Sequence, residues 1–371
     1  MKIALVVHDL HEHGGHSLYT KVLADELSHR HEVTVFANRC ERPPHSRWGF
    51  HQVRAWRASA LASVHTFPLG VRALATKLAD FEIRHMQGYC GGRPSVVTAH
   101  ICVAAYLDSL RDISRRNRLS LEWMAAAESR FYRRYQGRII AVSQKIAREL
   151  REFYHVSDNN ITVIPHGVDT DRFSGAGSAL DPRSVRGSVG VREGQRLALY
   201  VGDLTKSHTY LKALAEATAP DIQFVIVTRS ERYRWNASNV HFVPPTPEIE
   251  RYYRAADAFV FPSVYDAFGM VVLEAMASGL AVFSSDCAGA AELIHHGRDG
   301  FVIPLAQWVE ATADGLRDRA LLQSVGRAAA ETAARHDWQR VARAVEQVYF
   351  EAAAAERASE TGMKAGRTCS V

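Results

Sequence analysis

The chain has 371 residues, of which 47% are hydrophobic, and its formal net charge is +5. This length predicts two domains with packed cores, and no apolar run is long enough to span a bilayer. The five cysteines are scattered without close pairs, which argues against a disulfide framework or a zinc ribbon and fits a reducing cytoplasm.

Short apolar runs alternate with helical periodicity along the whole chain. Residues 2–8 predict a first strand rather than a signal peptide. The remaining predicted strands are residues 32–37, 96–100, 138–143, 161–165, 196–202, 222–228, 240–243, 258–262, 280–285 and 300–304. Because helices alternate with these strands, we predict an α/β protein with two doubly wound Rossmann-like domains.

Three local patterns predict helix faces and starts. One face of the first predicted helix carries Leu18, Val22, Leu23 and Leu27. Ser143 is the expected N-cap of a helix that carries Ile146 and Leu150. Thr246-Pro247 is the expected start of the helix through Tyr253.

The domain boundaries are predicted from composition. Residues 1–173 and 191–337 form the two expected domains, and residues 174–190 form a linker that contains glycine and serine. Residues 338–358 predict a long helix, and the polar residues 359–371 predict a disordered tail.

The segment from residue 264 to residue 279 carries two acidic residues, Asp266 and Glu274, around a Phe268-Gly269 step. The pattern predicts a strand, a turn, a helix over residues 270–277 and a stop at Gly279. The unpaired N–H groups and the positive dipole end of a helix start suit a phosphate. Asp266 could then reach a sugar and Glu274 a ribose, so the segment predicts a site for a nucleotide sugar.

This segment resembles the signature of the retaining family-4 glycosyltransferases (glycosyl transferases group 1), which have the GT-B fold. The shared features are two acidic residues separated by seven, an Ala-Met-Ala-x-Gly run and the Gly289-Ala-Ala-Glu292 step. The resemblance covers about residues 2–350, including residues 139–144 and 163–169. Asp266 departs from the pattern, because the family usually has Glu there.

The resemblance implies two domains that face each other across a cleft, with the helix of residues 338–358 crossing back to the first domain. It implies a nucleotide-sugar co-substrate and no metal or other cofactor. The implied donor-binding residues are Gly15, Lys206, Arg229, Asp266, Ala267, Phe268, Gly269, Met270, Val271 and Glu274.

Three residues are expected to act in the reaction: His100, Asp266 and Glu274. His100 ends a predicted strand, where a residue of this family approaches the transferred sugar, although a structural histidine is a rival interpretation. The family's usual arginine before the lysine is replaced by Asp203, so Arg229 is the candidate for the missing cation.

Two features near these residues have simpler interpretations. The loop that contains Gly14 and Gly15 could line the diphosphate site or form a simple turn before a helix. Histidines at positions 8, 11, 13 and 16 invite a metal site, but their spacing is not a clean ligand set.

The stretch from Arg111 to Arg138 contains eight arginines and three acidic residues. It suits an anionic membrane surface or an anionic acceptor, or it is a solvated helix face. No nucleic-acid-binding motif accompanies it.

The function expected from these observations is a cytoplasmic, metal-independent retaining hexosyltransferase, with a peripheral location on the inner face of the membrane as the alternative. It would use a nucleotide sugar, UDP in preference to GDP. The acceptor could be a glycan, a lipid-linked glycan or a small molecule. Two alternatives stay open: another GT-B enzyme, such as an epimerase or a sugar-phosphate synthase, and a non-catalytic sugar-nucleotide-binding partner protein.

Overall fold

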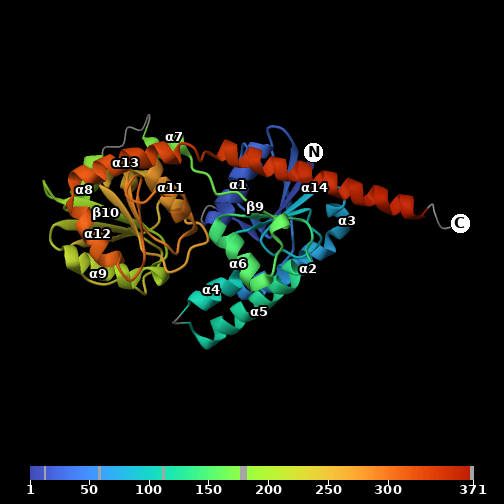
Figure 1. Cartoon of the computed structure of the whole chain (residues 1–371), viewed down its shortest axis with the longest axis horizontal. Coiled ribbons are helices and arrows are strands. Elements are labelled where there is room, and N and C mark those ends of the chain that lie inside the picture. Colours follow the sequence, from blue (N-terminus) through green and yellow to red (C-terminus); the bar gives the residue numbers. More distant parts are fainter. Residues whose placement is uncertain (12–13, 57–59, 111–112, 176–181, 368–371) are drawn as a thin grey trace. The chain divides into compact units, whose positions relative to one another are not determined.

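The structure is a computed structural model that describes residues 1–11, 14–56, 60–110, 113–175 and 182–367. It divides into two compact units. Unit 1 comprises Met1–His166 and Trp338–Val371, and unit 2 comprises Gly167–Asp337. Each unit contains one large parallel sheet with helices on its faces (Figure 1).

Unit 1 has a seven-stranded sheet in the order β5-β3-β1-β6-β7-β8-β9. Its strands are β1 (Lys2–Val6), β3 (Glu32–Ala37), β5 (Gly49–Gln52), β6 (Ile83–Gln87), β7 (Val96–Ala99), β8 (Arg138–Ala141) and β9 (Ile161–Val163). The short strands β2 (Asp9–Leu10) and β4 (Arg39–Cys40) pair separately. The helices are α1 (Gly15–Leu27), α2 (Ala60–Ala73), α3 (Ala75–Leu78), α4 (Val103–Ser109), α5 (Arg115–Tyr132), α6 (Gln144–Tyr154), η1 (Asp158–Asn160) and α14 (Trp338–Arg367).

Unit 2 has a six-stranded sheet in the order β12-β11-β10-β13-β14-β15. Its strands are β10 (Arg196–Val201), β11 (Ile222–Val227), β12 (Val240–Val243), β13 (Ala258–Phe261), β14 (Ala281–Ser285) and β15 (Phe301–Ile303). The helices are α7 (Thr170–Ser174), α8 (Pro182–Ser188), η2 (Leu204–Lys206), α9 (His208–Thr218), α10 (Glu250–Ala255), α11 (Met270–Ala277), η3 (Gly289–Leu293), α12 (Trp308–Arg317) and α13 (Arg319–Ala333).

The strand order of each sheet reverses direction once. In unit 1 the reversal lies between β1 and β6, and in unit 2 it lies between β10 and β13. Ligands of doubly wound sheets bind beside such reversals, outside the carboxyl ends of the strands. The loops that follow β10 and β13 are therefore the first place to look for a ligand site in unit 2.

Several expected local features are confirmed. Ser143 caps α6, since its side chain accepts a 3.1 Å hydrogen bond from the backbone N–H of Ile146. Helix α11 spans Met270–Ala277 as predicted. Gly279 follows its end with φ +75°, a left-handed conformation that glycine adopts without steric cost.

Two strands of the seven-stranded sheet of unit 1, β5 and β6, were not predicted. β6 carries the polar residues His85 and Gln87 in a buried position, so it lacks the apolar pattern of a central strand. The two ring nitrogens of His85 lie 2.6 Å from the Tyr349 hydroxyl and 2.7 Å from the Thr98 hydroxyl. These partners lie far away in the sequence, and they are what makes burial of the imidazole tolerable.

Two predictions about helices are wrong in detail. Leu23 and Leu27 of the expected face of α1 are buried, but Leu18 is 37% exposed and the buried face extends to Tyr19 instead. Helix α10 begins at Glu250 rather than after Thr246. The Thr246 hydroxyl instead accepts a 3.2 Å hydrogen bond from the Glu248 N–H and stabilises the preceding turn.

The expected linker and tail also differ from the structure. Residues 182–188 form α8, which packs against α10 inside unit 2. Arg186 holds it there through the Ala255 carbonyl at 2.8 Å and the Asp257 carboxylate at 2.9 Å. Residues 176–181 of the expected linker lie outside the described residues. Helix α14 continues to Arg367 instead of ending at residue 358, because extending a helix needs no new nucleation step.

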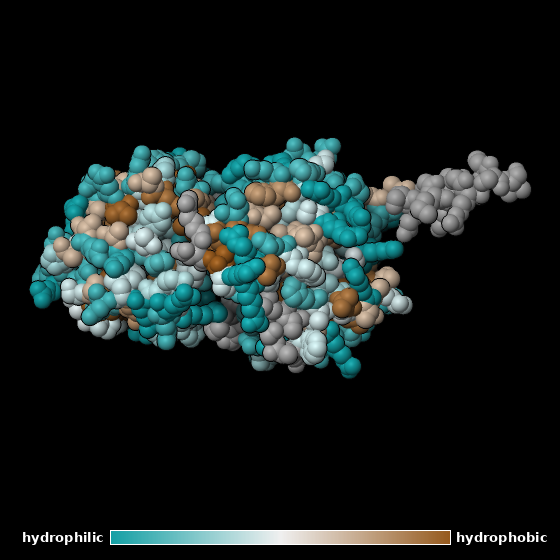
Figure 2. Space-filling model, turned by 90° about the horizontal axis from the view of Figure 1, so that it is seen from below, coloured by the Kyte–Doolittle hydropathy of each residue, from teal (hydrophilic) through white to brown (hydrophobic). Residues whose placement is uncertain are grey.

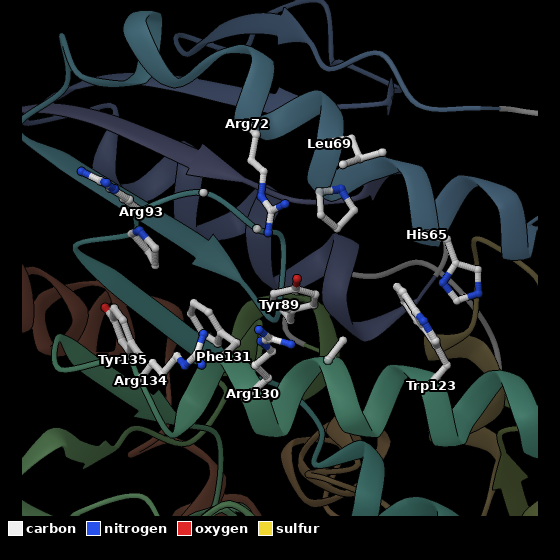
Figure 3. A pocket seen from close by; sticks show the side chains of 15 residues that line it. His65, Leu69, Arg72, Tyr89, Arg93, Trp123, Arg130, Phe131, Arg134 and Tyr135 are labelled. Atoms are coloured by element: carbon white, nitrogen blue, oxygen red, sulfur yellow. The ribbon is translucent and has the colours of Figure 1, made fainter.

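The molecular surface is mostly hydrophilic on the face drawn in Figure 2, where hydrophobic residues are exposed in small groups. Unit 1 also contains a groove of about 650 Å³ between α2 and α5 (Figure 3). We call it the α2–α5 groove and return to it below.

Candidate functional site

The N-terminus of α11 is built by a glycine and carries no side-chain cap. Gly269 precedes the helix with φ +88°, and a Cβ atom there would lie 3.2 Å from the Phe261 ring. Only glycine adopts this conformation routinely. Since Gly269 has no side chain, this N-cap makes no side-chain hydrogen bond to the first turn of the helix. The helix start is therefore open to an anion.

Asp266 lies in the loop between β13 and α11, and backbone hydrogen bonds hold this loop in place. The Asp266 N–H donates to the Cys287 carbonyl (3.1 Å), and the Gly289 N–H donates to the Asp266 carbonyl (3.0 Å). The Ala290 N–H donates to the Phe268 carbonyl (2.6 Å). The predicted Gly289-Ala-Ala-Glu292 segment, which follows β14, thus holds the loop that carries Asp266 in place.

Lys206 joins the loop after β10 to this acidic loop. Its ammonium lies 3.8 Å from Oδ2 of Asp266, and its carbonyl accepts a 3.1 Å hydrogen bond from the Val264 N–H. Both side chains are partly exposed, at 26% and 28%. A cation and a carboxylate thus meet where the strand order of unit 2 reverses.

Asp203, which replaces the expected arginine, has a structural role in the same loop. Its Oδ1 accepts hydrogen bonds from the N–H (2.9 Å) and the hydroxyl (2.6 Å) of Thr205 and caps η2. The Tyr200 hydroxyl donates to the Asp203 carbonyl at 2.9 Å. The aspartate therefore shapes the turn that presents Lys206.

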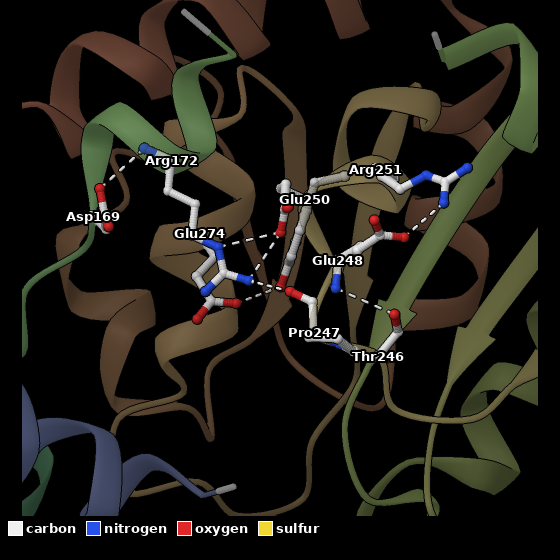
Figure 4. A network of polar contacts seen from close by, with 9 residues as sticks. Asp169, Arg172, Thr246, Pro247, Glu248, Glu250, Arg251 and Glu274 are labelled. Atoms are coloured by element: carbon white, nitrogen blue, oxygen red, sulfur yellow. Dashed lines mark hydrogen bonds and ion pairs between the residues drawn. The ribbon is translucent and has the colours of Figure 1, made fainter. Parts of the chain in front are cut away.

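Glu274 lies on α11, one turn beyond the open helix start, and it accepts a 2.9 Å hydrogen bond from the Tyr253 hydroxyl (Figure 4). Burial raises the pKa of the Glu274 carboxyl, while the Tyr253 hydrogen bond and the charge of Arg172 act in the opposite direction. A partly desolvated carboxylate of this kind strengthens a hydrogen bond to a ligand hydroxyl.

Arg172 of α7 fixes the surroundings of Glu274. Its guanidinium donates to the Pro247 carbonyl at 2.7 Å and to the Glu250 carboxylate at 2.9 Å (Figure 4). The Pro247 turn and α10 are thereby tied to α7, beside the carboxylate. Neither Arg172 nor Tyr253 has a sequence signal, since both act through partners that are distant in the chain.

Arg229 follows β11 and is exposed. Within the described part of the chain, no recorded ion pair or hydrogen bond connects it to Lys206 or Asp266. Its expected role as the second cation stays a prediction.

His100 and Gly15 lie in unit 1. His100 follows β7, and its Nε2 donates a 2.9 Å hydrogen bond to Oε1 of Gln87. Its ring centroid lies 3.9 Å from that of His16, 4.8 Å from that of Tyr19 and 5.4 Å from that of His166. Desolvation and the nearby imidazoles hold the pKa of His100 well below its usual range, so its ring is neutral at physiological pH.

Gly15 is the first residue of α1, after Gly14 with φ +107°. The same helix carries His16 and Tyr19 into the cluster around His100. The loop glycines therefore start the helix that delivers two members of this cluster, which sequence reasoning did not group together. His13 lies outside the described residues.

The described residues lack a metal-binding cluster and a helix that could cross a membrane. No group of three or more His, Cys, Asp or Glu side chains in this part of the chain could hold a metal ion. No described helix combines the length and apolarity required to cross a membrane.

Comparison with known proteins agrees with this geometry. Residues 195–320 match the family described as Glycosyl transferases group 1, and residues 13–172 match the one described as Glycosyltransferase Family 4. The chain belongs to these glycosyltransferases.

The chain is also similar to individual proteins in sequence and in structure. The chain is 28% identical to a D-inositol 3-phosphate glycosyltransferase of Nocardia farcinica over 62% of its own length, and it spans 56% of the length of that relative. Its fold is that of WaaG, a glycosyltransferase involved in lipopolysaccharide biosynthesis, with a TM-score of 0.80 at 20% identity over 94% of this chain and 99% of WaaG. It is also the fold of Anabaena Alr3699/HepE in complex with UDP-glucose, with a TM-score of 0.74 at 17% identity over 95% and 100% of the two chains. The fold is therefore GT-B.

Proposed function

We propose that the chain transfers a hexosyl group from a nucleotide sugar, preferably a UDP-sugar, to an acceptor hydroxyl, with retention of the anomeric configuration. The observation that carries the proposal is the uncapped N-terminus of α11 between Asp266 and Glu274, with Lys206 beside Asp266. The family membership and the UDP-glucose complex of the Anabaena protein support it.

Each group has a proposed role in donor binding. The diphosphate would accept hydrogen bonds from the first-turn N–H groups of α11 and face the Lys206 ammonium. Glu274 would accept hydrogen bonds from the ribose hydroxyls, and Asp266 would accept one from the sugar. These roles need no metal ion, because the helix start and the lysine supply positive charge.

The reaction breaks the bond between the sugar C1 and the diphosphate oxygen and forms a bond between C1 and the acceptor oxygen. The nucleoside diphosphate leaves with the bonding electrons, and its departing oxygen takes up the proton that the acceptor hydroxyl loses. Lys206 and the α11 dipole would stabilise the charge that develops on the leaving group. The expected role of His100, which belongs to unit 1, stays a prediction.

The proposal is tested by calorimetric titration of the full chain with UDP- and GDP-linked sugars. We expect one UDP-sugar to bind and Glu274→Ala to abolish this binding. Glu216→Ala, which removes an exposed carboxylate of α9, is the matched control and should bind as the wild type does.

A panel without any binding donor would contradict the proposal and favour a non-catalytic partner protein. Donor binding with release of free sugar phosphate or an epimerised donor, in place of transfer, would favour another GT-B enzyme.

A further inference from the structure

The α2–α5 groove of unit 1 is a second candidate site, distinct from the donor residues of unit 2. Helix α2 forms one wall, α5 with the residues after it forms the other, and the β6–β7 loop forms the floor (Figure 3). Its lining residues are His65, Pro68, Leu69, Arg72, Tyr89, Gly91, Gly92, Arg93, Pro94, Trp123, Ala127, Arg130, Phe131, Arg134 and Tyr135.

The groove has four arginines and no acidic residue in its lining. Arg72 and Arg130 point toward each other from opposite walls over Tyr89, and Arg93 and Arg134 lie toward one end (Figure 3). Among the described residues, no ion pair with a carboxylate is recorded for any of the four. Converging like charges repel each other, and a bound anion would remove this repulsion.

Aromatic side chains line the groove between the arginines. The rings of Phe131 and Tyr135 stack with centroids 5.2 Å apart, and Tyr89 lies 5.4 Å from Phe131. At the other end Trp123 packs edge-on against His65 at 4.2 Å. Flat apolar faces of this kind pack against the C–H faces of a sugar ring.

Glycines and anchored side chains preform the floor. A Cβ atom on Gly91 would lie 2.8 Å from Pro68, and one on Gly92 would lie 2.9 Å from Met86. Only glycine lets the β6–β7 loop approach α2 so closely, and both residues have positive φ. The Tyr135 hydroxyl donates to the Ser95 carbonyl at 2.9 Å and fixes the far end.

We propose that the α2–α5 groove binds a phosphate-bearing sugar. Its volume of about 650 Å³ suits a discrete ligand. Arginine forks match phosphate oxygens in geometry and charge. That this ligand is the charged part of the acceptor rests on the proposed function, whereas the binding itself does not.

An anionic membrane is the rival partner for the same residues. Leu69, Leu119 and Trp123 are exposed by 60%, 59% and 52%, and such side chains could insert into a bilayer. The concave shape and the aromatic lining favour a discrete ligand over a flat surface.

The experiment is calorimetric titration of the full chain with glucose 1,6-bisphosphate, with glucose as the neutral control. We expect the bisphosphate to bind, glucose not to bind, and affinity to fall with added salt. The double variant Arg72→Gln/Arg130→Gln should weaken binding by at least about tenfold, since hydrogen bonds to charged groups are lost. The variant Arg72→Lys/Arg130→Lys should bind the bisphosphate with intermediate affinity, because lysine keeps the positive charge but lacks the paired N–H donors of the guanidinium.

The matched control is Arg115→Gln/Arg116→Gln, which removes the same charge from exposed positions of α5 outside the groove. It should bind within about twofold of the wild type, as exposed charges act weakly at a distance. Equal losses in both double variants would overturn the proposal, as would the absence of bisphosphate binding. Binding only to vesicles of phosphatidylglycerol and phosphatidylcholine would assign the groove to a membrane. Titration with the donor reports separately on the site in unit 2.

Discussion

The Tyr253 hydroxyl donates a 2.9 Å hydrogen bond to Oε2 of Glu274, and the two residues come from different helices. Tyr253 is fully buried, so its position is fixed by packing. The tyrosine keeps a partly desolvated carboxylate oriented at the candidate ribose site.

Removal of this hydroxyl should weaken donor binding. We expect Tyr253→Phe to raise the pKa of Glu274 further, because burial already raises it and the hydrogen bond opposes that effect. Donor affinity should fall by roughly tenfold and fall more at low pH, where more of Glu274 is protonated. Calorimetry across a pH series measures this. Tyr252→Phe on the same helix is the control, and an equal loss there would contradict the assignment.

Lys206 should act in the transfer step more than in binding. Lys206→Met should lower kcat by about a hundredfold, the size of effect seen when one group that stabilises developing charge is removed. Thermal stability should change little, because its 3.8 Å ion pair with Asp266 is partly exposed. Lys212→Met, at an exposed position of α9, should leave kcat unchanged. If kcat were unchanged in Lys206→Met, another cation would have to stabilise the leaving group, with Arg229 the first to test.

Alanine variants of two glycines in unit 2 can distinguish the effect of backbone strain from the loss of the anion site. Gly269 and Gly194 have nearly equal φ angles of +88° and +87°, but a Cβ atom at Gly194 would meet nothing within 4 Å. Both alanine variants should lose about 1–2 kcal/mol of stability from the left-handed backbone. Only Gly269→Ala should lose donor binding as well. Chemical denaturation and calorimetry measure the two effects, and a donor affinity equal in both variants would count against an anion at α11.

Acid should destabilise the protein through histidines that are buried in the neutral state. Burial lowers the pKa of His85 and of His166 from 6.5 to about 3. Between these values the unfolded chain binds more protons than the folded chain, so the free energy of unfolding falls as pH drops from about 6.5 toward 3. Above about pH 6.5 neither group changes the stability.

Each histidine should contribute a slope of about 1.4 kcal/mol per pH unit within that window. His85→Gln should reduce the slope measured by urea denaturation at a series of pH values. His45→Gln, at an exposed position, should not. A slope unchanged in His85→Gln would show that this imidazole is already protonated in the folded protein.

Much of the fold follows from local sequence patterns. The strands of unit 2 are mostly apolar, and all six residues of β11 are buried. Such runs predict buried strands without any knowledge of the elements that pack against them. Helix α11 was also predictable, since Gly269 and Gly279 mark its two ends.

β6 could not be predicted in this way. His85 and Gln87 make it look like a surface segment, and it is buried only because Tyr349 and Thr98 supply hydrogen bonds from other elements. The groove between α2 and α5 could not be predicted from the sequence either. The arginine-rich stretch was visible, but its convergence with Arg72 required the packing of two helices.

The sequence by itself determined the alternation of strands and helices and the acidic pair around the α11 start, because these depend on residues close in the chain. Only the tertiary structure decided which side chains meet. Lys206 reaches Asp266 because two strand ends lie beside each other, and Tyr253 reaches Glu274 because two helices pack together. Such contacts depend on the parallel order of the sheet, which brings distant loops to one edge.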